Sequence, residues 1–166
     1  MPAIQIRPAS RGDAGLILRF IIELAVYEKA EEQVKAGVAD IERSLFAADA
    51  TAYGLVCSVD GEAAGYAVYF FNYSTWLGKN GLYLEDLYIT PKHRGKGAGK
   101  ALFRHLARLA VQKDCGRFEW SVLDWNEPAI RFYESCGAGA QSEWIGYRLA
   151  GEAQRAFAAS EPDGPS

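Results

Sequence analysis

The spacing of apolar and polar positions separates helices from strands in the first half of the chain. Apolar residues recur at helical spacing between residues 16 and 24, and Asp13 stands where the N-cap of that helix is expected. A second, shorter helix is expected to start at Asp40. Residues 4–7, 53–59 and 63–73 read as strands, and Asp60-Gly61 favours a tight hairpin turn between the last two. The pattern predicts a strand, two helices and an antiparallel pair.

The second half of the chain alternates between strands and helices. Strands are expected at residues 82–89, 117–122 and 144–149, with a helix at 98–113. A further helix is expected to begin at Asn126 as N-cap, with Pro128 in its first turn and Gly137 at its C-terminal end. The order β-α-α-β-β-β-α-β-α-β predicts an α/β (α+β mixed) fold. Its central mixed, mostly antiparallel sheet ends in a β-α-β crossover and is flanked by helices.

Length and composition indicate one globular domain. The chain has 166 residues, of which 49% are hydrophobic and 23% charged, which is ordinary for a folded domain of this size. The last residues, Ser-Glu-Pro-Asp-Gly-Pro-Ser, offer nothing to bury. We therefore expect a single domain over residues 1–158 and a disordered tail over residues 159–166.

Charge and cysteine content exclude several functional classes. The net charge of −3 argues against a general nucleic-acid binder, which needs a basic surface. No run approaches the length of a membrane span or a signal peptide, so no membrane partner is expected. Three widely spaced cysteines fit a reducing compartment, so we expect the cytoplasm. With His93 and His105 as its two histidines, the chain has little to offer a zinc ion, and no metal is expected.

The strongest chemical signal is a glycine-rich turn between the strand at 82–89 and the helix at 98–113. The segment reads Arg94-Gly95-Lys96-Gly97-Ala98-Gly99-Lys100, and no acidic residue lies between Lys92 and Arg108. Glycines let backbone N–H groups approach an anion, and a helix N-terminus adds positive potential. The spacing fits neither a nucleotide P-loop nor a Gly-x-Gly-x-x-Gly dinucleotide fingerprint. We predict a polyphosphate site of another kind, the alternative being a solvated basic helix face.

This turn, together with Leu87-Tyr88-Ile89 before it, resembles the acyl-CoA signature of the GNAT superfamily of N-acetyltransferases. Several further segments resemble its spermidine/spermine (diamine) acetyltransferase branch: Tyr27-Glu28, Glu31-Glu32-Gln33-Val34, Leu82-Tyr83-Leu84-Glu85-Asp86, Trp125-Asn126-Glu127-Pro128 and Phe132-Tyr133. The resemblance covers residues 4–149. It implies a GNAT-like fold, acetyl-CoA as donor and a homodimer.

The resemblance also assigns site residues. It implies that the backbone of Leu87, Tyr88 and Ile89 holds the pantetheine arm. The diphosphate is expected at Arg94, Gly95, Lys96, Gly97, Ala98, Gly99 and Lys100. Asn126, Pro128 and Ala129 complete the expected acetyl-CoA contacts, and Tyr27, Glu28 and Glu85 are expected to bind the amine. An N-cap role for Asn126 is compatible with a pantetheine contact.

Two consecutive carboxylates in a largely apolar strand are candidates for the acid–base chemistry. Alternation sends Glu85 and Asp86 to opposite faces of the strand, where burial needs partners or a raised pKa. We predict Glu85 as the general base for the attacking amine and give Asp86 second place. By resemblance Tyr133 is the general acid, and the alternative is that this tyrosine only packs in the core. Cys136 is expected to be a packing residue rather than a nucleophile.

The acceptor is less sharply predicted than the donor. Where the diamine branch carries Tyr-Asp-Pro-Trp, this chain has Tyr73-Ser74-Thr75-Trp76, and Trp144-Ile145 replaces a pair of carboxylates. Fewer carboxylates weaken recognition of a second, distant ammonium group. We expect a primary amine of a small molecule, such as a diamine, polyamine or lysine-like amino acid. Acetylation of protein amines and a non-catalytic CoA-binding sensor are the alternatives.

Overall fold

The computed structural model describes residues 1–162, and the chain divides at residue 124 into two compact units. The first unit is Met1–Leu123, and the second begins at Asp124. We describe each unit by itself, and the expected single domain over residues 1–158 stays a prediction. No helix in the described part of the chain is long and apolar enough to cross a membrane.

A five-stranded sheet organises the first unit. Its order is β1 (Ile4–Pro8), β2 (Ala52–Val59), β3 (Glu62–Ser74), β4 (Lys79–Ile89) and β5 (Phe118–Trp120). The strands β1 to β4 pair with one another in antiparallel fashion, whereas β5 runs parallel to β4. This arrangement confirms the predicted mixed, mostly antiparallel sheet with a terminal β-α-β crossover. The last of these strands is shorter than the expected 117–122.

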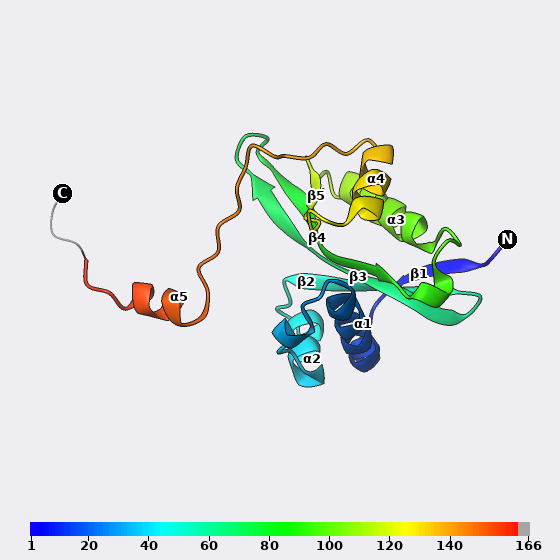
Figure 1. Ribbon diagram of the computed structural model, residues 1–166, viewed down its shortest axis with the longest axis horizontal. Helices are drawn as coiled ribbons and strands as arrows, with labels where there is room; N and C mark the ends of the chain where they lie inside the picture. The colour runs from blue at the N-terminus through cyan, green and yellow to red at the C-terminus, as the bar shows by residue number, and fades with distance from the viewer. Residues whose placement is uncertain (163–166) are drawn as a thin grey trace. The chain divides into compact units, whose positions relative to one another are not determined.

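Helices cover both faces of this sheet, as Figure 1 shows. On one face lie α1 (Ala14–Tyr27) and α2 (Val38–Phe46), and on the other lies α3 (Ala98–Gln112). Phe20 of α1 is fully buried and stacks on Tyr66 of β3, with ring centroids 5.7 Å apart. On the opposite face, α3 buries Leu102, Phe103 and Leu106. Each helix therefore presents its apolar stripe to the sheet, as the sequence spacing predicted.

Two of the expected helix starts differ in detail. The Asp13 carboxylate does not cap α1; it accepts hydrogen bonds from the backbone N–H of Ser10 at 2.8 Å and from both terminal nitrogens of Arg7 at 2.8 and 2.9 Å. A 3-10 turn, η1 (Arg11–Asp13), runs directly into the helix, so Asp13 holds the predicted N-cap position of α1 without a side-chain cap hydrogen bond. Likewise α2 begins at Val38, and Asp40 accepts from the Gly37 N–H at 2.8 Å.

The hairpin between β2 and β3 has the predicted turn. Asp60 and Gly61 both take positive φ angles, 49° and 79°. Consecutive left-handed residues match the twist of the two strands, and aspartate and glycine tolerate them best. The turn is fastened to the start of the chain because the Asp60 carboxylate accepts a hydrogen bond from the Ala3 N–H at 2.8 Å.

The second unit contains α4 (Glu127–Ser135) and α5 (Gly151–Ala158). Asn126 caps α4 through its side-chain oxygen, which accepts from the Ala129 N–H at 3.4 Å, and Gly137 follows the helix with a φ of 94°. Both features were predicted. The strand expected at residues 144–149 is wrong, because that segment forms no strand and its apolar side chains are exposed, Tyr147 at 95%. The α5 helix was not predicted. Of the expected tail, residues 163–166 lie outside the described part.

Candidate active site

The edge of β4 opens at its C-terminal half. β5 pairs with β4 at three positions, from Leu82 to Leu84, whereas β3 stays paired with β4 as far as Ile89. Within the described strands, residues 85–89 therefore have a neighbour on one side alone. Backbone N–H and C=O groups along such an edge are a template for another extended, amide-containing chain. The predicted pantetheine segment, Leu87 to Ile89, lies on this open edge.

A β-bulge accompanies the opening. The register with β3 shifts between Val68, which pairs with Asp86, and Tyr69, which pairs with Leu84, so Glu85 is the extra residue. Bulges bend a strand, increase its twist and redirect side chains. The strict alternation from which we placed Glu85 and Asp86 on opposite faces is therefore interrupted between them. The sequence carries no turn residue here that could have revealed the bulge.

The glycine-rich turn and the start of α3 form an anion cradle. Gly95 and Gly97 have φ angles of 77° and 87°, in the left-handed region, and α3 begins directly afterwards at Ala98. The N–H groups of the first helical turn have no acceptor within the helix, and the helix dipole places positive potential there. The first turn holds no acidic residue, and Lys96 and Lys100 are exposed beside it. This donor set suits a diphosphate.

Contacts with Glu62, at the start of β3, hold the segment that precedes this cradle. Lys92, in the 3-10 turn η3 (Pro91–His93), donates to both carboxylate oxygens of Glu62 at 2.8 and 2.9 Å. Buried His93 lies with its Nε2 3.5 Å from the same carboxylate. The loop therefore starts from an anchored position, although its glycines are open to solvent.

An acidic cluster lies beside the open edge, on the face of the sheet that carries α1. The Tyr66 hydroxyl donates a hydrogen bond to Asp86 at 2.7 Å. Burial raises the pKa of Asp86, against the lowering effect of this hydrogen bond. Burial, followed by the charge of Asp86, raises the pKa of Glu28 at the end of α1. Two carboxyl groups thus share a region where negative charge is unfavourable, and a cation placed between them would relieve both.

Glu85 differs from its neighbour. Its side chain is exposed, and its charge is close enough to contribute to the raised pKa of Tyr66, although burial is the largest cause of that shift. Sequence reasoning ranked Glu85 above Asp86 because it could not tell which of them is desolvated. In the structure Asp86 is the half-buried residue. Tyr66, which bonds it, was not anticipated as a site residue, since an isolated tyrosine in an apolar strand gives no signal beyond core packing.

The guanidinium of Arg94 lies over two tyrosine rings. Its Cζ is 5.3 Å from the ring centroid of Tyr27 and 5.5 Å from that of Tyr88. Its Nε donates to the carbonyl oxygen of Ile89 at 2.9 Å. Arg94 was predicted as a diphosphate contact, but its side chain already bonds the end of β4 and stacks on the end of α1. The structure thus brings Tyr27 and Glu28 to the same side of the sheet as the start of the cradle.

The remaining predicted residues lie in the second unit. Asn126 and Ala129 meet through the cap hydrogen bond, with Pro128 in the first turn of α4. Tyr133 is half-buried on the same helix, and its ring centroid lies 5.6 Å from that of Phe132. Their assignment to acetyl-CoA and to acid catalysis stays a prediction.

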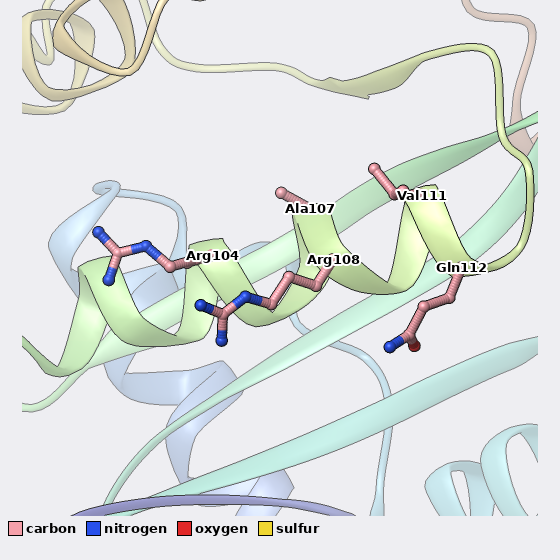
Figure 2. Close-up of a pocket in the computed structure, with 5 residues that line it drawn as sticks. All are labelled: Arg104, Ala107, Arg108, Val111 and Gln112. Carbon is pink, nitrogen blue, oxygen red and sulfur yellow. The ribbon is translucent and has the colours of Figure 1, made fainter.

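A separate surface hollow lies on α3, away from the predicted site residues. Figure 2 shows its lining side chains, and its volume is about 400 Å3. The hollow is lined by Arg104, Ala107, Arg108, Val111 and Gln112. The side chains of Arg104 and Arg108 point toward the N-terminal end of the helix, as long helical side chains usually do. It is shallow and exposed, with Val111 79% accessible, and we assign it no part in the chemistry.

Comparison with known proteins agrees with this geometry. A family model described as the acetyltransferase (GNAT) family matches residues 20–138. A thialysine N-epsilon-acetyltransferase of Sus scrofa is 40% identical over 169 residues, covering 95% of this chain and 99% of that protein. A spermidine/spermine N(1)-acetyltransferase-like protein 1 of Homo sapiens is 35% identical over 156 residues, covering 90% of this chain and 22% of the relative. The solved structure of an integron cassette protein from the V. cholerae mobile metagenome matches with a TM-score of 0.78 and 26% identity, covering 95% of this chain and 98% of that one.

Proposed function

The chain belongs to the GNAT acetyltransferase family and is an N-acetyltransferase, and from this premise we propose that it acetylates a primary amine of a small molecule with acetyl-CoA as donor. The favoured acceptors are diamines and lysine-like amino acids, with polyamines included. The observation that carries the acceptor proposal is the pair of carboxyl groups, Glu28 and Asp86, beside the open edge of β4. The names of the thialysine and spermidine/spermine relatives support the same class of substrate.

The residues present fit acetyl-CoA. Positive φ at Gly95 and Gly97 turns the backbone of residues 95–100 around the start of α3, where its amides would hold the diphosphate. The unpaired edge at residues 87–89 would bond the amides of the pantetheine arm in the manner of an added strand. When bound, acetyl-CoA supplies an acetyl group activated as a thioester. Asn126, Pro128 and Ala129 are further proposed contacts.

The acidic cluster would recognise the amine as a cation. A primary alkylammonium group resembles that of lysine, whose pKa is about 10.4, so the acceptor arrives protonated at neutral pH. Glu28 and Asp86 would attract it, and Tyr27 would line the approach. The raised pKa values of the two carboxyl groups indicate that the cluster is more stable with positive charge beside it.

The chemistry requires three proton and charge movements. Glu85, directly or through a water molecule, would accept the proton that the ammonium must lose before its nitrogen attacks. A backbone N–H of residues 87–89 would donate to the acetyl carbonyl oxygen as negative charge develops on it. As the new C–N bond forms and the C–S bond breaks, Tyr133 would donate a proton to the departing thiolate, and the nitrogen would lose its second proton, which restores the phenol. No covalent bond to the protein is needed, so transfer is direct, in a ternary complex.

A thiol-release screen tests this proposal. Acetyl-CoA is offered with diamines, polyamines, thialysine, lysine, ornithine and lysine-containing peptides, and the released CoA thiol is measured. We expect release with the small amines and little with peptides. Release with peptides alone would identify a protein acetyltransferase. Binding of acetyl-CoA without release with any amine would leave a CoA-binding sensor and contradict the proposal.

Two conservative variants test the proton-transfer roles. Glu85→Gln and Tyr133→Phe should each lower kcat by about 100-fold, in the range by which a positioned general base or acid contributes. Tyr53→Phe is the matched control, because Tyr53 is a partly exposed tyrosine that packs on Tyr69 in the β2–β3 region. Wild-type kcat in both test variants would remove the roles we assign.

A further inference from the structure

Arg94 lies at the start of the loop proposed to bind acetyl-CoA, whereas its side chain contacts the segment proposed to bind the amine. It precedes Gly95, the first glycine of the cradle, and its guanidinium stacks on Tyr27, the last residue of α1. Tyr27 is followed directly by Glu28, one of the two carboxyl groups of the acidic cluster. One planar cation therefore connects the loop proposed for the diphosphate to the segment proposed for the amine.

A second line of contacts leads from Arg94 to the other carboxyl group. The guanidinium also stacks on Tyr88, whose ring centroid is 6.2 Å from that of Phe20. Phe20 in turn stacks on Tyr66 at 5.7 Å, and Tyr66 donates its hydrogen bond to Asp86. Tyr88, Phe20 and Tyr66 are all buried, so these contacts are packed rather than separated by solvent.

We infer that Arg94 is a positioning residue that couples cofactor binding to amine binding. The inference rests on the proposed function. A diphosphate bound at residues 95–100 would hold the start of the loop in one position, and Arg94 would then hold Tyr27 and Tyr88 in theirs. The acidic cluster is thereby arranged before the amine arrives, so the amine meets a site that needs less ordering.

Thermodynamic linkage makes this coupling measurable in both directions. If CoA raises the affinity for the amine by some factor, the amine must raise the affinity for CoA by the same factor. Couplings between sites in proteins are commonly about 5-fold to 150-fold. Packed side chains between two sites do not prove coupling by their position, so the test has to compare affinities in variants.

The experiment is calorimetric titration of thialysine in the absence and in the presence of saturating CoA. CoA carries no acetyl group, so no reaction disturbs the measurement. For the wild-type protein we expect CoA to tighten thialysine binding at least about 5-fold. In Arg94→Gln the ratio should fall to about 1. Arg94→Lys should lose the coupling as well, because lysine keeps the charge but not the planar group that stacks on two rings.

Lys96→Gln is the matched control for charge. Lys96 lies two residues further along the same loop, is exposed, and makes no ring contact within residues 1–162. Its loss should weaken CoA binding while the ratio of thialysine affinities stays at the wild-type value. An unchanged ratio in Arg94→Gln, or a wild-type ratio of 1, overturns the inference.

The Tyr27 side of the contact gives an independent pair of variants. Tyr27→Phe keeps the ring under the guanidinium and should keep the coupling, whereas Tyr27→Leu should abolish it. These two variants test the coupling even if Arg94→Gln binds CoA too weakly to be saturated. Failure of the proposed function would be seen separately, as absence of thiol release with every amine. Normal turnover with unaltered coupling in Tyr27→Leu would reject the inference and leave the proposed function standing.

Discussion

Asp86 carries its carboxyl group in a place from which water is partly excluded. Burial is the main cause of its raised pKa, and the hydrogen bond from Tyr66 offsets this effect in part. Because the folded state binds the proton more tightly than the unfolded state, stability falls as the pH rises from the ordinary value near 3.8 through the raised pKa. Asp86 therefore costs stability at neutral pH, as residues kept for function often do.

Asp86→Asn should accordingly make the protein more stable and less active. Asparagine keeps an oxygen that accepts from Tyr66 and removes the buried charge, so we expect the free energy of unfolding at pH 7 to rise by about 1 kcal/mol. The same variant should raise the KM for the amine, since one carboxylate of the cluster is lost. Denaturant unfolding and steady-state kinetics measure the two effects. A variant that is less stable at pH 7 would show that the charge is well accommodated.

The pKa of Asp13 is shifted in the opposite direction to that of Asp86. The hydrogen bonds from Arg7 are the largest cause that lowers its pKa to about 2, and its side chain is 12% exposed. The unfolded state binds the proton more tightly here, so the stabilisation is present above about pH 4 and is lost as the pH falls toward 2. This pair joins β1 to the start of α1 and stabilises the fold rather than the site.

Asp13→Asn tests this sign. We expect the variant to lose about 2 kcal/mol of unfolding free energy at pH 7, with the difference from wild type shrinking as the pH approaches 2. Asp49→Asn is the matched control, because Asp49 is exposed in the turn that follows α2. A difference between Asp13→Asn and wild type that stays constant from pH 7 to pH 2 would contradict the assigned cause.

The start of α3 combines a helix terminus with two left-handed glycines. Alternation of apolar residues, the helical stripe and the glycine spacing were enough to place β4, the turn and α3 in this order. The bulge at Glu85 was not predictable, because it depends on how β4 registers against β3 rather than on either strand alone. For the same reason the sequence could not show that β5 pairs with three positions of β4 and leaves the rest open.

Gly97→Ala should weaken acetyl-CoA binding without unfolding the protein. A side chain is strained at a φ of 87°, by about 1–2 kcal/mol, so the turn would shift and its amides with it. We expect the dissociation constant for acetyl-CoA to rise at least about 10-fold, measured by calorimetry, with a small loss of melting temperature. Gly12→Ala is the control, because Gly12 has no positive φ and its added Cβ would meet no atom within 4 Å. Wild-type affinity in Gly97→Ala would argue against a diphosphate at this turn.

The expected homodimer rests on the family resemblance alone. The expected homodimer and the expected cytoplasmic location stay predictions. The apolar side chains of Trp144, Ile145, Tyr147 and Leu149, between 55% and 95% exposed, form a surface of a kind that is often covered by a partner. A second copy of this chain would provide such cover.

Light scattering coupled to size-exclusion chromatography tests the dimer. We expect twice the mass of one chain, and Ile145→Lys should shift the population toward the monomer if this segment is covered by the partner copy. Gln141→Lys adds the same charge at a nearby exposed position and should leave the mass unchanged. A wild-type protein that elutes with the mass of a single chain at all concentrations would refute the prediction.

Local patterns decided most of the elements and the conformation of the glycine-rich turn before α3. Helical periodicity, the Asp60-Gly61 turn, the Asn126 cap and the glycines after β4 depend on residues close together in the chain, whose preferences are local. The register of β4, the burial of Asp86, the effect of its charge on Glu28 and the stacking of Arg94 on two rings required the folded molecule. Each depends on which distant segments meet, and neither spacing nor composition contains that information.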